Sequence, residues 1–162
     1  MSNDIINRAR AGDKQAFAQL YTQQKDKLFR YAFFKLGNAQ DAQDAVSGCV
    51  AEAYAGITQL KSEKAFSAWI FKILYRQCCA LIRERTQLVP EQEEIAVSGY
   101  SYLAVELKEA LAILSPEDRD IVLLSAVAGY KTREIADMLH LNHATVRSKL
   151  SRALAKMKTF LE

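Results

Sequence analysis

Cationic and hydroxyl-bearing residues alternate near the end of the sequence. Five of them stand close together: Arg147, Ser148, Lys149, Ser151 and Arg152. Guanidinium and ammonium groups bind phosphates and guanine edges, and a serine hydroxyl can bond to either. Positive charge is concentrated here, because residues 141–162 hold five basic residues and one acidic residue, whereas residues 103–140 hold four basic and seven acidic ones. We therefore expect this stretch to contact a nucleic-acid backbone.

An apolar stripe runs through the same stretch. Its members recur every three or four positions: Val146, Leu150, Ala153, Leu154, Met157 and Leu161. This spacing predicts an amphipathic helix that buries the stripe and leaves the basic residues on its other side.

The preceding segments predict that this helix is the second helix of a helix-turn-helix. Ser115 and Pro116 are typical of a helix start, and Gly129 is typical of a left-handed helix end. A short helix is predicted at residues 132–139, followed by a tight break in which Asn142 caps the last helix. Such a pair places its second helix in the major groove of DNA. The alternative is a solvated basic helix in an ordinary bundle, but the caps and the short leading helix favour DNA binding.

The composition predicts an all-α protein. Half of the 162 residues are hydrophobic and a quarter are charged, glycine and proline are scarce, and no apolar/polar alternation marks a strand. Caps and apolar stripes predict a four-helix bundle in the first domain, with helices at residues 3–12, 13–37, 38–57 and 63–85.

Three segments are expected along the chain. A four-helix domain at residues 1–85 precedes an acidic linker at 86–102, and a helix-turn-helix domain follows at 103–162. The linker contains Pro90 and three glutamates and no basic residue. Fully extended, it would reach about 56 Å. Two modules joined in this way could contact two separated elements of one DNA site.

The sequence shows no pattern typical of an enzyme. It lacks a glycine-rich phosphate loop, a nucleophile–base arrangement and a metal-ligand cluster, so we expect no catalysis, cofactor or metal. His140 and His143 stand three apart without a suitable partner, and DNA-backbone contact or turn packing explains them better than a metal site.

The three cysteines, Cys49, Cys78 and Cys79, lack metal-binding spacing and are expected to be reduced packing thiols in a cytosolic protein, with a redox switch as the lesser alternative. The most apolar stretch, residues 65–82, is interrupted by Lys72 and Arg76, so no membrane insertion is expected.

Nearly the whole chain resembles bacterial RNA polymerase sigma factors of the two-domain extracytoplasmic-function group. In the first domain the resemblance rests on Gly12-Asp13, Ala16-Phe17, Leu20-Tyr21 and residues 28–32, 37–46 and 66–73. In the second domain it rests on residues 114–119, 134–136 and 145–153. Each motif is weak alone, but their order and spacing are specific.

The resemblance implies a protein that binds core RNA polymerase and directs it to promoter DNA. In the family, the helix matching residues 38–57 docks on a polymerase coiled coil, with Asp41 and Asp44 at matching acidic positions. These carboxylates would also complement the helix dipole, and both roles can coexist. The resemblance further implies an anti-sigma factor as a partner.

Two sets of DNA-contacting residues follow from the resemblance. The helix matching residues 66–85 helps to open and read the downstream promoter element, with Lys72, Tyr75, Arg76 and Arg83 as candidates. The final helix reads the upstream element, with the candidates His143, Thr145, Arg147, Ser148, Lys149, Ser151 and Arg152. Among the aromatic residues, Phe66 and Trp69 are expected in the core, whereas Phe71 and Tyr75 could equally pack or stack on an unpaired base.

Several positions depart from the family pattern. Ser47 and Gly48 replace a usual Gln-Glu pair, and Gly48 inside a helix costs about 1 kcal/mol relative to alanine. Arg76 and Ala80 replace a usual Asn and Asp on the promoter-opening helix, although Arg76 could still hold phosphates. Lys131 stands where a serine cap is favoured, and His140 stands where the turn usually has glycine.

Two other functions stay open at this point. A stand-alone helix-turn-helix regulator would bind operator DNA itself, as a dimer. A sigma-like interaction protein would bind partners without promoter activity. The departures at Ser47, Gly48 and Arg76 keep both alternatives open.

Overall fold

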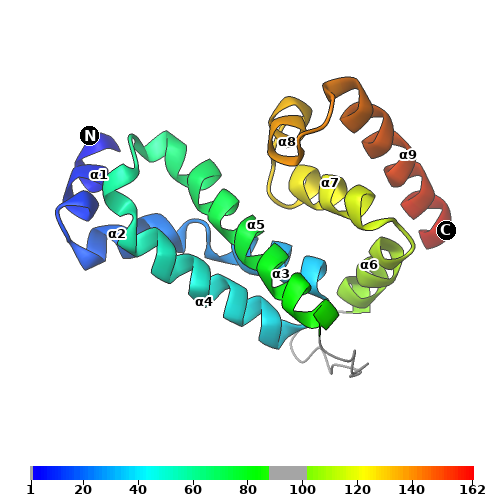
Figure 1. Cartoon of the computed structure of the whole chain (residues 1–162), viewed down its shortest axis with the longest axis horizontal. Coiled ribbons are helices and arrows are strands. Elements are labelled where there is room, and N and C mark those ends of the chain that lie inside the picture. The colour runs from blue at the N-terminus through cyan, green and yellow to red at the C-terminus, as the bar shows by residue number, and fades with distance from the viewer. Residues whose placement is uncertain (1, 88–101) are drawn as a thin grey trace.

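The computed structural model describes residues 2–87 and 102–162, and the helices in these ranges form two groups (Figure 1). The first group contains α1 (Ser2–Arg10), α2 (Lys14–Thr22), α3 (Lys25–Leu36), α4 (Ala39–Ala55), a 3-10 turn η1 (Ile57–Gln59) and α5 (Glu63–Gln87). The second contains α6 (Tyr102–Ala112), α7 (Pro116–Ala126), α8 (Thr132–Leu139) and α9 (His143–Leu161). The all-α prediction with two helical domains is therefore confirmed. The predicted linker, apart from its ends in α5 and α6, lies outside the described residues.

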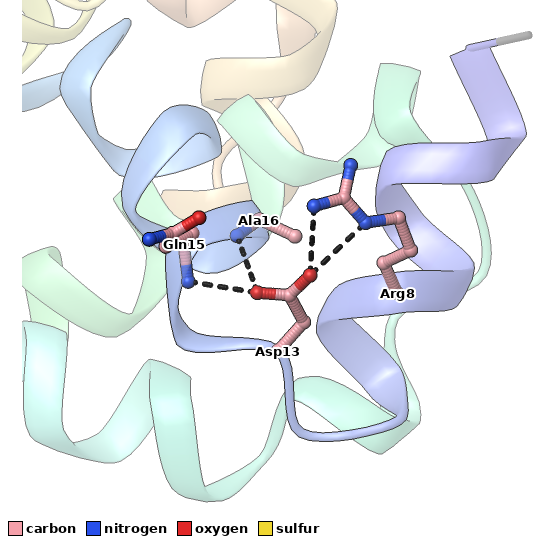
Figure 2. Close-up of polar contacts among 4 residues, drawn as sticks. All are labelled: Arg8, Asp13, Gln15 and Ala16. Atoms are coloured by element: carbon pink, nitrogen blue, oxygen red, sulfur yellow. Dashed lines mark hydrogen bonds and ion pairs between the residues drawn. The ribbon is translucent and has the colours of Figure 1, made fainter.

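A local cap begins α2 where the sequence predicts a helix start. The Asp13 carboxylate accepts hydrogen bonds from the backbone amides of Gln15 and Ala16 and pairs with Arg8 at 2.8 Å (Figure 2). The Arg8 hydrogen bond and then the Ala16 amide hold the pKa of Asp13 below its usual value. Asp13 thus joins the end of α1 to the start of α2.

The prediction of one helix over residues 13–37 is wrong. The helix ends at Thr22 and restarts at Lys25, so residues 2–87 contain five α-helices where four were expected. Gln24 at the break accepts a hydrogen bond from Ser67 on α5 at 3.2 Å. The break lets α2 pack on α1 while α3 packs on α4 and α5. No glycine or proline stands at the break between α2 and α3. Tertiary packing therefore sets this boundary, and a local helix-breaking residue does not.

Helix α5 is the core helix of the first group. Its buried residues pack against α3 and α4, and they are Phe66, Ile70, Phe71, Ile73, Leu74 and Cys78. By length and composition alone α5 could cross a membrane, but Lys72 and Arg76 are exposed along its middle. Helix α4 approaches α5 closely at Gly48, where a Cβ atom would lie 2.8 Å from Gln77 Oε1. The glycine that departs from the family pattern therefore makes room for this side chain.

The second group has the predicted helix-turn-helix. Ser115 Oγ accepts from the Asp118 amide at 3.2 Å, and Gly129 has the predicted left-handed conformation, with φ of 78°. His140 also lies in the left-handed region, with φ of 57°, which explains why glycine is favoured at this turn.

The apolar stripe of α9 is only partly buried. Val146, Ala153 and Met157 are buried, whereas Leu154 and Leu161 are 47% and 43% exposed, so the prediction that they are buried is wrong. The described helices that cover α9, namely α6, α7 and α8, do not cover every turn of its apolar side.

The two groups pack against each other, although the sequence suggested separate modules. Helix α3 contacts α7, and the Lys35 ammonium pairs with the Asp120 carboxylate. Tyr130, just after α7, donates a hydrogen bond to the Ala68 carbonyl on α5 at 3.0 Å. The buried apolar residues of both groups form one continuous cluster through this contact.

Candidate nucleic-acid interface

Four polar residues share one exposed face of α9. Arg147, Ser148, Ser151 and Arg152 are exposed and, with Ala144, line a shallow surface hollow. They lie at spacings of three and four residues, which brings their side chains together on one side of the helix. Arg152 Nε donates to the Ser148 carbonyl at 3.3 Å. This face offers two cations and two hydroxyls to the same ligand.

Two hydrogen bonds fix the start of α9. The Asn142 side chain accepts from the Ala144 amide at 3.0 Å, as the predicted cap requires. His143 Nε2 lies 2.8 Å from Thr132 Oγ1, which ties α9 to the start of α8. His143 and Thr145 are half-buried, so both predicted contacts lie at the margin of the exposed face.

Lys149 lies elsewhere on α9. Its ammonium is 2.7 Å from Glu117 and 3.8 Å from Asp118, at the start of α7. The hydrogen bond to Glu117 is the main cause that raises the pKa of Lys149. This lysine therefore joins α9 to α7 and is separate from the hollow. The sequence held a signal for this position. Lys149 stands three residues after Val146 and four before Ala153, both buried, so it lies on the same side of the helix as the apolar stripe.

The predicted downstream-element residues lie on two sides of α7. Lys72, Tyr75 and Arg76 line a groove of about 1110 Å³ between α5 and the α7–α8 region. Arg83 lines a smaller hollow that also includes Pro116 and Arg119. The structure therefore brings three of these four residues together.

Individual contacts hold the α5 side chains in place. Arg76 pairs with Glu52 on α4 at 3.1 Å, and the Lys35 ammonium lies 4.8 Å from the centre of the Tyr75 ring. Burial raises the pKa of Tyr75. Phe71 is 1% exposed and packs edge-on against Tyr130, so in this arrangement it cannot reach a nucleic-acid base.

The two acidic candidates on α4 differ in their surroundings. Asp41 is half-buried, accepts from the Asn38 side chain at 2.7 Å and pairs with Arg85 near the end of α5. Asp44 is exposed. Asp41 therefore joins α4 to α5, whereas Asp44 presents its carboxylate to solvent. The Arg85 contact could not be anticipated, because its two residues lie far apart in sequence.

The cysteines and histidines form no candidate metal centre in the described ranges, where no cluster of three or more potential ligands occurs. Cys49 and Cys78 are buried, and burial raises the pKa of each thiol to about 12. Both thiols pack in the first helix group.

Comparison with known proteins gives matches to both helix groups. The family model for Sigma-70 region 2 matches residues 20–87, and the model for Sigma-70 region 4 matches residues 104–157. The matches occur in this order in one chain and together cover most of it. The protein belongs to the sigma-70 family.

Individual relatives place this sigma-70 protein in the extracytoplasmic-function type. It is 28% identical over 156 residues to the ECF RNA polymerase sigma factor SigM of Mycobacterium tuberculosis, which covers 93% of this chain and 80% of that protein. It is also 28% identical over 142 residues to the RNA polymerase sigma factor SigV of Bacillus subtilis, covering 85% and 86% of the two chains.

Solved structures share the sigma-70 protein's fold. CnrH, determined in complex with the cytosolic domain of CnrY, matches with a TM-score of 0.74 and 22% identity over 99% of this chain and 96% of that chain. The sigma factor RpoE of Bartonella quintana, determined with the anti-sigma factor NepR, matches with a TM-score of 0.74 and 23% identity over 90% and 96%.

The region 2 match contains the α4 and α5 candidates, and the region 4 match contains the exposed face of α9. The residues at the contact between the two regions, Lys35, Asp120 and Tyr130, were not singled out by the sequence. Tyr130 gave one weak signal, because it is a large aromatic residue in the short connection between two predicted helices, directly after Gly129.

Proposed function

We propose that this protein is a sigma factor that binds core RNA polymerase and directs it to promoters. The observation that carries this function is the presence of both sigma-70 regions, in order, in one chain. The relatives that match over most of their length are named as RNA polymerase sigma factors. The role is regulatory and has no catalytic step of its own. It places the protein in the cytoplasm, where the chromosome is transcribed.

In this proposal α9 reads the upstream promoter element. Its exposed face carries two arginines that can pair with guanine edges or phosphates, and two serines that can bond to either. Lys149 has a different role, because its charge is used on Glu117 and Asp118. It positions α9 relative to α7, and the hollow makes the contact with DNA.

Helix α5 binds the downstream element through Lys72, Tyr75 and Arg76. These three residues line one groove, as a single strand would require. Arg76 replaces the asparagine usual in the family, so we assign it to phosphate binding and not to base reading. Its ion pair with Glu52 lies in solvent, where the Arg76 side chain is 70% exposed, so a phosphate can take the place of this carboxylate.

Asp44 is the better candidate for docking on the polymerase. It is exposed on α4, whereas Asp41 is held by Asn38 and Arg85. Asp41 then acts by positioning the start of α4. An anti-sigma factor is the expected regulatory partner, as in the solved complexes of the structural relatives.

The test is promoter binding with and without core polymerase. Footprinting on promoter-bearing DNA should show protection only when both the protein and core enzyme are present. Reversing the charges of Arg147 and Arg152 to glutamate should abolish this protection. The matched control reverses the exposed Lys14 and Lys64 of the first helix group and should retain it. Symmetric protection by the protein alone would instead identify a stand-alone regulator.

A further inference from the structure

One of the three cysteines is accessible from solvent. Cys49 and Cys78 are both 0% exposed, whereas Cys79 on α5 is half-buried. Burial raises the pKa of the two covered thiols to about 12, so they stay protonated at neutral pH. A thiol must be accessible and ionised to react as a nucleophile. Thiol chemistry of the folded chain is therefore restricted to Cys79.

Cys79 lies in the wall of a hollow between α5 and the start of α7. The hollow has a volume of about 280 Å³, which is close to the lower end of the range for small-molecule sites, about 300 Å³. Its other lining residues include two apolar and four charged side chains: Ile82, Pro116, Lys35, Arg83, Arg119 and Asp120. The space next to the thiol thus fits a small organic group.

The hollow carries positive charge. Lys35 and Asp120 pair with each other, so their charges balance. The Arg119 guanidinium donates to two backbone carbonyls near the end of α6, at 3.1 and 3.3 Å. These acceptors are neutral, so Arg119 keeps its charge, and Arg83 adds a second cation at the exposed rim. A ligand with carboxylates is therefore attracted to the thiol.

A buried polar group lies behind the hollow. The Tyr31 side chain on α3 is fully buried, and its hydroxyl has no hydrogen-bond partner among the described residues. Burial, followed by the Asp120 carboxylate, raises the pKa of Tyr31, and Cys79 contributes to the same shift. The hydroxyl is therefore close to two residues of the wall. A buried donor without an acceptor is unfavourable, so this end of the hollow favours a ligand that supplies an acceptor atom.

We propose that Cys79 and this hollow form a thiol-exchange site for small disulfides that carry carboxylates. The Cys79 thiolate attacks one sulfur of the disulfide, so that a new S–S bond forms while the original S–S bond breaks. The other half of the disulfide leaves as a thiolate, and the proton lost by Cys79 passes to solvent. Cys79 is oxidised and the leaving half is reduced, so the disulfide itself is the oxidant. The retained half occupies the hollow, with its carboxylates next to Arg83 and Arg119.

Mass spectrometry of the intact full chain with oxidised glutathione tests the site. The folded protein should gain a single adduct, peptide mapping should place it on Cys79, and Cys79→Ser should gain none. In denaturant all three cysteines should react, because the fold and not the reagent makes the selection. A folded protein that gains no adduct, or that is modified at Cys49 or Cys78, would overturn the proposal.

Two coloured disulfide probes test the charge of the hollow. Dithiobis(nitrobenzoate) carries two carboxylates, whereas dithiodipyridine is neutral, and absorbance follows the thiol that each releases. The ratio of the rate with the carboxylate probe to the rate with the neutral probe should be higher for the folded than for the denatured chain. High salt should remove this difference. Equal ratios at low salt would show that Cys79 is only an accessible thiol and would overturn the site.

Arg83→Gln should lower the rate with the carboxylate probe by about threefold, the effect of one screened charge, and leave the rate with the neutral probe unchanged. Lys64→Gln is the matched control. Lys64 is exposed in the first turn of α5, about 22 Å along the helix from Cys79, and its loss should change neither rate. An equal effect of both substitutions would show that net charge, and not the hollow, sets the preference.

Tyr31→Phe tests the buried end of the hollow and keeps the packed ring. It should lower the equilibrium constant for formation of the glutathione adduct by about fivefold, the effect of one lost hydrogen bond. An unchanged constant would show that the adduct does not reach this hydroxyl and would remove Tyr31 from the site. None of these measurements involves DNA or polymerase, so failure of the thiol-exchange site leaves the proposed function unaffected.

Discussion

Removal of single cations from α9 should separate residues that contact DNA from the lysine that only supports the helix. Arg147 and Arg152 are exposed in the same hollow, whereas the Lys149 ammonium is paired with Glu117 and Asp118. Each phosphate contact contributes about 0.9 to the slope of log affinity against log salt concentration. We therefore expect Arg147→Ala and Arg152→Ala each to lower this slope by about 1 if the arginine contacts phosphate, and together by about 2.

Lys149→Ala should behave differently, because its charge is already balanced by the two carboxylates. For this variant the slope of log affinity against log salt concentration should stay close to the wild-type value. The variant should unfold at a lower denaturant concentration than the wild type. The assay is fluorescence anisotropy of holoenzyme on upstream-element duplex over a series of salt concentrations. If Lys149→Ala lowers the slope as much as Arg152→Ala, the division of α9 into a DNA face and a supporting side is refuted.

Three substitutions test the local structure by denaturant unfolding. Gly48→Ala should stabilise by up to about 1 kcal/mol through helix propensity, because the flexible end of Gln77 can move away; destabilisation would show that Gln77 is fixed. His140→Gly should stabilise by about 0.5–1 kcal/mol, the difference between left-handed strain and the entropy cost of glycine; a loss would show that the histidine side chain contributes favourable contacts. Asp13→Asn keeps a cap but loses the Arg8 ion pair. Folding lowers the pKa of Asp13, so the ionised carboxylate contributes to the free energy of unfolding. This contribution is complete above about pH 3.8 and is lost as the pH falls through the folded pKa. A difference in stability between wild type and variant that grows on acidification would contradict this.

Much of the fold could be predicted from the sequence because short-range chemistry sets it. Caps at Asp13, Ser115 and Asn142 hydrogen-bond to amides two or three residues away, and Gly129 ends its segment through its own conformation. The break between α2 and α3 could not be predicted in this way. It follows from packing against other helices, and Gln24 there bonds to a residue 43 positions away.

In the candidate site, too, the sequence predicted what local periodicity sets and missed what long-range contacts set. Periodicity along α9 correctly separated the buried Val146 from the exposed Arg147 and Arg152. It did not reveal the partners of Lys149, because the carboxylates that bind it belong to α7. The Lys35–Asp120 contact spans 85 positions, and no local pattern indicates such a pair. The long-range ion pairs of Lys149 thus separate it from the exposed arginines of α9.

The most direct test of the central claim is transcription by purified core RNA polymerase on fragments of the source genome. Core enzyme with this protein should start transcription at defined sites that share upstream and downstream elements. Core enzyme alone, or with the Arg147→Glu/Arg152→Glu variant, should not start there. If the folded wild-type protein produces no start sites beyond those of core enzyme alone, the account of this chain as a promoter-directing sigma factor is contradicted.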